Sequence, residues 1–152
     1  MGLLDCASGA SLWRGYDYHK SNKVNNLIET DTGIFTADVV GTASEPYAVE
    51  IDVAHPRKSK CNCPHADGKR IVCKHMVATY FAAYPEEAQR IYDEAMAYQA
   101  EEEIRASELS NKVITYVGKM KKDDLCQVLL EMLFDGPEWQ YDRFVREHGL
   151  DE

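Results

Sequence analysis

Four potential metal ligands lie in two close pairs within fifteen residues of this chain. The first pair is Cys61 and Cys63, and the second is Cys73 and His75. Three thiols and one imidazole are the donor set of a structural zinc site, in which the protein fills all four coordination positions. The spacing therefore predicts a bound Zn2+ with no open position for a substrate. The alternative is three buried free cysteines beside a core histidine, which leaves the paired spacing unexplained.

The first pair constrains the backbone that carries it. In an extended strand the Cα atoms of Cys61 and Cys63 are about 6.6 Å apart, with both side chains on one face. Two sulfurs bound to one zinc ion are only about 3.8 Å apart, so the side chains must lean together or the strand must bend. Pro64 favours an extended residue before it and has no backbone donor, which suits a strand end.

The second pair requires a helix start. Residues two apart on an α-helix point in nearly opposite directions, so Cys73 and His75 cannot both lie in mid-helix and bind one ion. We expect Cys73 immediately before the helix, with its thiolate near the positive end of the helix dipole, and His75 in the first turn. Pro85 is expected to end this helix. Its apolar stripe comprises Met76, Val77, Tyr80, Phe81 and Tyr84.

The segment around the two pairs is basic, although the chain as a whole has a formal net charge of -9. Residues 55–75, called the basic knuckle below, contain six cations and one carboxylate, and residues 64–70 within it are turn formers and charged residues. A cationic surface of this kind suits contact with phosphate groups. Alternatively, the cations only offset the thiolates and keep the loop in solution. The candidate nucleic-acid contacts are Arg57, Lys58, Lys60, Lys69, Arg70 and Lys74.

The order Cys-x-Cys, a short loop, and Cys-x-His at the start of an apolar helix resembles the SWIM-type zinc finger. The upstream stretch from Trp13 to Tyr18, followed by short strands, is similar to that family too, so the resemblance covers roughly residues 9–84. It implies a small module of sheet and helix, with Cys61, Cys63, Cys73 and His75 as metal ligands. It also implies DNA binding or protein contacts, and it does not imply an enzyme.

Strand-forming residues precede the knuckle. Residues 23–30, 33–40 and 46–54 predict a three-stranded antiparallel meander, and the third strand alternates apolar and polar side chains as a half-buried strand does. Residues 10–19 predict a short helix that closes one face of the sheet. We expect the aromatic side chains of this helix to belong to the core rather than to a surface for stacking bases.

The residues after Pro85 predict only helices. Pro85 can open a helix, two apolar stripes follow, and Pro137 can open a last one. Residues 86–110 contain eight acids and two arginines, so this region is expected to repel nucleic acid. The sequence thus predicts an α+β zinc module at residues 1–85 and an acidic helical extension at residues 86–152.

Several functional classes are not expected. The sequence has no metalloprotease His-Glu-x-x-His, no phosphate-binding P-loop, no Gly-x-Ser-x-Gly elbow and no deaminase signature, so we expect no enzyme. The cysteine count of five and the absence of a secretory segment argue against a disulfide framework and favour the cytoplasm. No apolar run has the length to span a membrane.

Two hypotheses about function remain open. In the first, a non-catalytic zinc module contacts nucleic acid through the charge of the basic knuckle. In the second, the protein is an adaptor that docks on a larger DNA-processing protein through the zinc module or the helical extension. The sequence does not choose between DNA, RNA and protein, and it does not indicate the oligomeric state.

Overall fold

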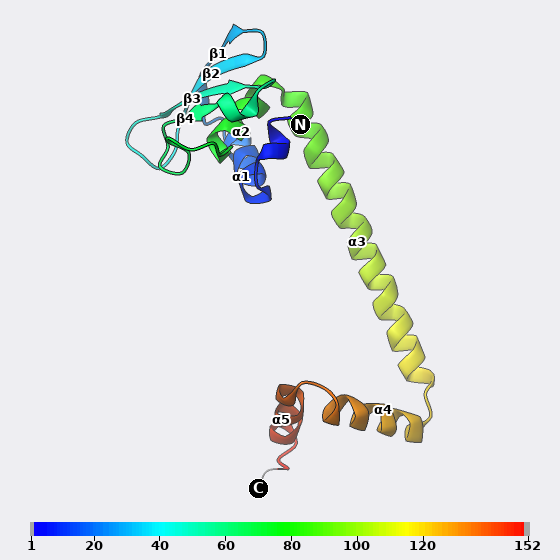
Figure 1. Ribbon diagram of the computed structural model, residues 1–152. Helices are drawn as coiled ribbons and strands as arrows, with labels where there is room; N and C mark the ends of the chain where they lie inside the picture. The colour runs from blue at the N-terminus through cyan, green and yellow to red at the C-terminus, as the bar shows by residue number, and fades with distance from the viewer. Residues whose placement is uncertain (1, 151–152) are drawn as a thin grey trace. The chain divides into compact units, whose positions relative to one another are not determined.

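The computed structural model describes residues 2–150 (Figure 1). Its elements in chain order are η1 (Leu4–Cys6), α1 (Gly9–Lys20), β1 (Val24–Asp31), β2 (Ile34–Val39), β3 (Tyr47–Asp52), η2 (Pro56–Lys58), β4 (Lys60–Cys61), α2 (Lys74–Ala83), α3 (Pro85–Lys119), α4 (Lys122–Phe134) and α5 (Glu138–Glu147). The predicted α+β class is confirmed, with an N-terminal helix, an antiparallel sheet and a mostly helical C-terminal region.

The sheet has four strands in the order β1-β2-β3-β4, whereas the sequence predicted three. The predicted meander is present, and each of its strands begins and ends within two residues of the expected position. The added strand β4 is two residues long and pairs with β3 through Val49↔Cys61 and Glu50↔Lys60. Two residues are too few to produce a periodic pattern, which is why sequence analysis missed this strand.

Side chains complete the outer edge of β3 where β4 is too short to do so. The amide of Ala48 donates to Oδ1 of Asn62 at 3.0 Å, and the amide of Asp52 donates to Oγ of Ser59 at 3.0 Å. Asn62 also donates its own amide to the carbonyl of Ala48 at 3.3 Å. Asn62 and Ser59 flank β4 in the sequence, so the edge of β3 is hydrogen-bonded on both sides of the short strand.

The core lies between the sheet and the two helices that cover it. Helix α2 packs against β2 and β3, and α1 packs on α2 (Figure 1). Strand β3 buries alternate residues as its sequence predicted. Tyr16 of α1 is buried and meets Phe81 of α2 in an edge-to-face contact, with ring centroids 6.0 Å apart. Trp13, which was also expected in the core, retains 38% of its surface.

The N-terminal segment contributes to this core, which the sequence did not predict. Leu3 is 1% exposed and belongs to the main cluster of buried side chains. Ala7 forms an isolated parallel bridge with Val72, the residue before Cys73. A single leucine outside any periodic pattern carries no signal of burial, so only the structure reveals that this segment lies beside the start of α2.

The first turns of helix α3 pack against the core. Ala88 is buried, and the ring of Tyr92 stacks on Tyr16 with centroids 5.0 Å apart and an angle of 4° between the planes. Contacts divide the chain into two compact units between Met96 and Ala97. Within residues 97–150 no residue is buried.

A single helix of 35 residues covers the stretch where the sequence predicted more than one. Residues 86–117 contain neither glycine nor proline, so nothing in the sequence interrupts the helix. The glutamates near its middle lie on a helix face, where Glu102 pairs with Arg105 at 2.6 Å and Glu103 accepts from Gln99 at 3.0 Å. These acids therefore support the helix by contacts between adjacent turns.

No helix among residues 2–150 combines the length and apolarity needed to cross a membrane.

Gly15 allows α1 and α2 to approach closely. A Cβ atom at this position would lie 2.5 Å from Cγ1 of Val77 and 2.9 Å from the carbonyl oxygen of Lys74.

We expect Gly15→Ala to lower the free energy of unfolding by about 1–3 kcal/mol, because one of the two helices must move. Urea unfolding in the presence of zinc measures the change. Gly9→Ala in the same helix is the matched control, because nothing lies within 4 Å of its added Cβ. Equal stability of the two variants would contradict this account of the contact.

Candidate metal centre

The four predicted donors gather at one place in the structure. One ligand atom from each of Cys61, Cys63, Cys73 and His75 lies within 4.8 Å of the other three. All four residues are buried, with exposed fractions of 1–3%. Buried thiols and imidazoles that converge in this way are the inventory of a closed structural zinc site. The Cys3His cluster therefore fits Zn2+.

Two structural elements bring the pairs together. Cys61 is the last residue of β4, and its pairing with Val49 fixes it to the sheet. Cys63 follows in a turn in which its carbonyl accepts from the amides of Ala66 at 3.0 Å and Asp67 at 2.9 Å. The strand therefore ends at Cys61 and the chain turns at Cys63, which is one of the two arrangements that the spacing of the first pair allowed.

The second pair lies at the start of α2, as the sequence predicted. Cys73 is the N-cap residue with an extended backbone (φ -91°, ψ 168°), and His75 is the second residue of the helix. This arrangement removes the conflict between residues two apart on a helix, because Cys73 precedes the helical turn. The cluster thus connects the end of the sheet to the beginning of the helix that covers it.

The geometry identifies the ring nitrogen that faces the sulfurs. Nδ1 of His75 lies 3.6 Å from Sγ of Cys61 and 3.9 Å from Sγ of Cys73. A nitrogen and a sulfur bound to one tetrahedral zinc ion are separated by about 3.6 Å. Nδ1 is therefore in position to bind the metal, which leaves the ring proton on Nε2.

Electrostatics at the helix start favour a thiolate at Cys73. The hydrogen bond from Cys61 lowers the pKa of the Cys73 thiol, and hydrogen bonds from His75 and from the backbone of Met76 act in the same direction, against the opposite effect of burial. The same contact with Cys73, together with burial, raises the pKa of Cys61. A thiolate at a helix N-terminus is the form that binds zinc.

Aromatic side chains enclose the imidazole of His75. The ring of Tyr47 stacks on it with centroids 4.5 Å apart, and the ring of Tyr18 lies 5.4 Å away. Gly41 packs against both Tyr47 and His75, since an added Cβ would lie 2.3 Å from the Tyr47 ring and 3.4 Å from Nε2. Sequence analysis did not single out these residues, because their positions near the metal result from the fold rather than from a ligand spacing.

Nε2 of His75 is buried and has no hydrogen-bond partner among the described residues. A histidine that binds metal through one nitrogen usually donates the proton of the other nitrogen to a carboxylate, a carbonyl or water. An unpaired buried donor costs about 1–3 kcal/mol. This atom is thus an unsatisfied polar group at the edge of the metal centre.

The basic residues of the knuckle occupy two places. Five of the six line a groove of about 1140 Å³ beside the outer face of the sheet: Arg57, Lys58, Lys60, Lys69 and Arg70. Lys74 lies elsewhere, with its ammonium donating to the Tyr18 hydroxyl at 2.7 Å and lying 4.4 Å from the Tyr18 ring centroid. The sequence placed Lys74 with the others because of proximity along the chain, whereas the start of α2 directs it to α1.

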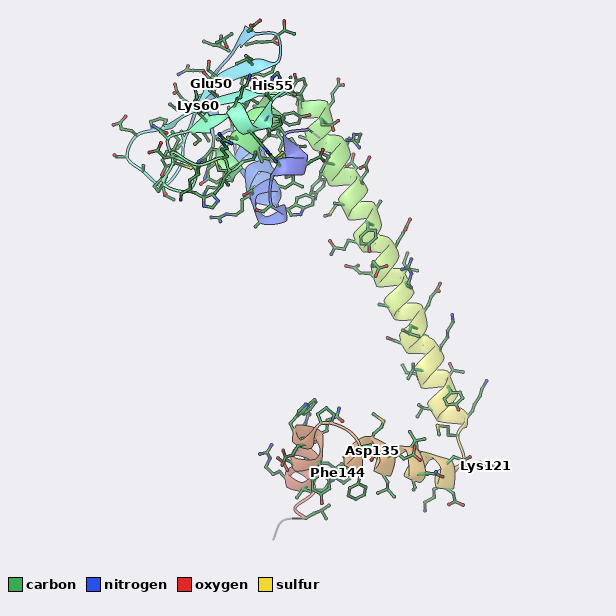
Figure 2. The ribbon with its side chains drawn as sticks, in the orientation of Figure 1. Glu50, His55, Lys60, Lys121, Asp135 and Phe144 are labelled. Atoms are coloured by element: carbon green, nitrogen blue, oxygen red, sulfur yellow. The ribbon has the colours of Figure 1, made fainter. Side chains whose placement is uncertain are left out.

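The groove also contains carboxylates. Asp38, Glu50 and Asp52 come from the strands and Asp67 from the loop, so the sheet side is acidic and the knuckle side is mainly basic. Lys60 pairs with Glu50 at 3.5 Å across neighbouring strands (Figure 2). This pair is exposed and contributes little to stability.

Two other histidines close to the motif in the sequence, and the two other cysteines of the chain, lie outside the cluster. His65 is exposed, and His55 is exposed and pairs with Asp52 at 3.2 Å. Cys6 is partly buried and Cys126 is exposed, both as free thiols. The sequence prediction gave none of these four residues a role in metal binding.

The comparisons with known proteins agree with this geometry. Residues 47–84 match the model of the SWIM zinc finger, which spans β3, the basic knuckle and α2. The predicted resemblance is thereby confirmed for this part of the chain, and residues 9–46 lie outside the match. No curated protein and no solved structure matches the chain. The chain contains a SWIM zinc-binding module, and no catalytic domain is detected.

Loss of one thiolate is expected to unfold the zinc module. Structural zinc contributes on the order of 10–16 kcal/mol to folding, which exceeds the net stability of a small domain. We expect Cys73→Ser to lose bound zinc and the chemical-shift dispersion of residues 9–84, while helical circular dichroism from the C-terminal helices persists. Metal analysis measures the bound zinc, NMR spectra measure the dispersion, and circular dichroism measures the remaining helices. Cys126→Ser is the control, because that thiol is exposed and outside the cluster. A Cys73→Ser variant that melts like the unaltered protein would refute the structural role of the site.

Proposed function

We propose that this protein is a non-catalytic, zinc-binding interaction protein that contacts nucleic acid through its basic knuckle. Cys61, Cys63, Cys73 and His75 are the metal ligands in this proposal. Because they fill all four coordination positions, the metal has no site for a substrate or an activated water. A cytoplasmic setting suits the site, since its three thiols must stay reduced to bind the ion.

The observation that carries this proposal is the groove lined by five cations of the knuckle. Arg57 and Lys58 come from η2, Lys60 from β4, and Lys69 and Arg70 from the loop before Cys73. All five side chains are exposed. Lys69 and Arg70 lie between the ligands Cys63 and Cys73, so metal binding is expected to hold their loop beside the cations of η2 and β4. Nucleic-acid binding is therefore expected to depend on zinc.

The charge distribution of the groove restricts how a nucleic acid can lie there. Asp38, Glu50 and Asp52 on the sheet side repel phosphates, so the backbone of the nucleic acid lies along the knuckle side. No helix of the described residues enters the groove to read base edges, since η2 is the only helical segment among the lining residues and has three residues. Binding of this kind is driven by phosphate charge and has little sequence preference.

The proposal predicts a specific change in salt dependence. Changing Lys58, Lys60, Lys69 and Arg70 together to Ala removes up to four phosphate contacts, so the slope of log K against log salt should fall by about 3–4 for duplex DNA. Fluorescence anisotropy with duplex and single-stranded oligonucleotides at several salt concentrations measures the slope. The control variant changes Lys112, Lys119, Lys121 and Lys122 to Ala, which removes the same charge outside the zinc module. Unaltered binding of both DNA and RNA by the knuckle variant would rule this function out.

A second candidate function is supported by the C-terminal unit. Residues 97–150 bury no side chain, yet many large apolar side chains there are exposed, including Leu109 (62%), Val113 (53%) and Tyr116 (71%). These three lie on one face of α3 at helical spacing. Unpartnered apolar surface of this extent is typical of a protein-binding surface. In this function the zinc module is residues 1–85 and the docking extension is residues 86–152. The first turns of α3 belong to the extension by sequence and pack on the module.

The adaptor function is tested by substitutions on the exposed face of α3. We expect Leu109→Asp combined with Val113→Asp to abolish a stoichiometric protein complex that survives nuclease and high salt, because a charge cannot be buried unpaired in an apolar interface. Ser110→Asp combined with Asn111→Asp is the matched control, since it adds the same charge at neighbouring polar positions of the helix. Co-purification followed by mass spectrometry compares the variants. A partner retained equally by both would place its docking surface elsewhere.

A further inference from the structure

Helix α3 and the residues that follow it contain two oppositely charged segments of equal length. Residues 93–103 have five carboxylates and no cation, whereas residues 112–122 have four lysines and no carboxylate. The residues between them, 104–111, contain one arginine and one glutamate. Because α3 is one unbroken helix of 35 residues (Figure 1), the acidic segment and most of the basic segment belong to a single rod. The sequence predicted a break here, so this pairing of charges becomes visible only in the structure.

A stripe with heptad spacing runs along the same helix. Its C-terminal half consists of large apolar side chains at alternating spacings of four and three residues: Leu109, Val113, Tyr116 and Met120. The same spacing continued towards the N-terminus reaches small or polar side chains: Ala106, Glu102, Gln99 and Ala95. One half of the stripe therefore has bulk where the other half has room.

The stripe has no partner among the described residues. Its large members Leu109, Val113 and Tyr116 are exposed, and so are Val117 (42%) and Met96 (40%) beside it. Residues 97–150 bury no side chain, so the C-terminal helices have no core of their own. In water a helix is stabilised mainly by packing its apolar face against another surface. We therefore expect an occupant for this face of α3.

We propose that the occupant is a second copy of this chain, with the two α3 helices antiparallel. When Gln99 of one copy lies opposite Tyr116 of the other, residues 93–103 of each copy lie opposite residues 112–122 of its partner. The five carboxylates then meet the four lysines at both ends of the pair. A parallel pair would instead place the carboxylates beside one another and the lysines beside one another, and like charges repel.

The apolar stripe selects the same register as the charges. With Gln99 opposite Tyr116, Ala106 lies opposite Leu109 and Ala95 lies opposite Met120. Small side chains thus face large ones, which is how two surfaces interdigitate without voids. The apolar contacts supply the affinity of such a pair, while the charges fix its orientation.

Glu102 is the one charged residue of the stripe, and in this register it lies opposite Val113. Its carboxylate already pairs with Arg105 of its own helix at 2.6 Å. A polar residue in a helical seam costs stability and favours a single register. Glu102 therefore limits the affinity of the pair, and we expect the two copies to exchange between monomer and dimer.

The dimer does not depend on nucleic-acid binding. It shares the exposed face of α3 with the second candidate function and gives that face a different occupant. A measurement on the purified chain, with no other protein or nucleic acid present, therefore separates this inference from both candidate functions.

Sedimentation of the zinc-loaded full chain measures the oligomeric state. We expect a concentration-dependent equilibrium that reaches twice the mass of one chain. Changing Lys112, Lys119, Lys121 and Lys122 together to Ala should raise the dissociation constant by about tenfold or more, because each lysine is lost twice in a symmetric pair. The knuckle variant with four alanines is the matched control, since it removes the same charge from the zinc module and should leave the dissociation constant unchanged. A monomer at every concentration, or equal effects of the two variants, would overturn the dimer.

Cysteine cross-linking tests the orientation. Cys6→Ser and Cys126→Ser leave the four-ligand cluster as the site of all native thiols. In that background, chains with Gln99→Cys and chains with Tyr116→Cys are oxidised separately and as a mixture, with zinc present. The antiparallel pair predicts cross-linked dimers only in the mixture, because the introduced thiols of two identical chains are about 25 Å apart. Cross-links within each variant alone, or none in the mixture, would refute this arrangement.

The outcomes for the dimer and for the candidate functions are distinguishable. A dimer whose knuckle variant keeps its affinity for oligonucleotides supports this inference and contradicts nucleic-acid binding through the knuckle. A chain that sediments as a monomer, yet loses a protein complex when Leu109 and Val113 are changed to Asp, supports the adaptor function and overturns the dimer.

Discussion

A single closed set of four side chains joins the end of the sheet to the start of α2, and the N-terminal unit depends on this junction. Cys61 is held by β4, while Cys73 and His75 belong to the first turn of the helix that covers the core. A unit of fewer than 100 residues has a small core, so a metal ion adds a large share of its stability. The groove of the basic knuckle depends on the same junction, because Cys61 is one of its lining residues.

The surroundings of His75 connect metal binding to the rest of the fold. Tyr47 begins β3 and also stacks on the imidazole, and Tyr18 of α1 lies on another side of it. The hydroxyl of Tyr18 in turn accepts a hydrogen bond from Lys74. The sheet, α1 and α2 therefore all contact the ligand or its neighbour. The orientation of the imidazole is fixed by packing before any metal bond is considered, which keeps Nδ1 towards the sulfurs.

The parts of the structure that could be predicted from the sequence are those set by local rules. Helical geometry alone placed Cys73 before the helix and His75 within it, and period-two alternation identified β3. The sequence contained no comparable signal for β4, which has two residues, or for the burial of Leu3. Lys74 was grouped with the other cations by its position in the chain, because the direction of a side chain at a helix start depends on its neighbours in the fold. The enclosure of His75 by Tyr47 and Gly41 also arises only when distant segments pack together.

The short strand β4 affects how the sheet can meet other chains. An unpaired strand edge offers a row of amides and carbonyls to which a foreign strand can add, the usual origin of sheet extension between molecules. On β3 the amides of Ala48 and Asp52 are already occupied by Asn62 and Ser59, on either side of the residues that pair with β4. A peptide therefore cannot pair with this edge of β3 without first displacing the segment that carries Cys61. The residues that close this edge of β3 are thus the same ones that hold Cys61 in place beside the other metal ligands.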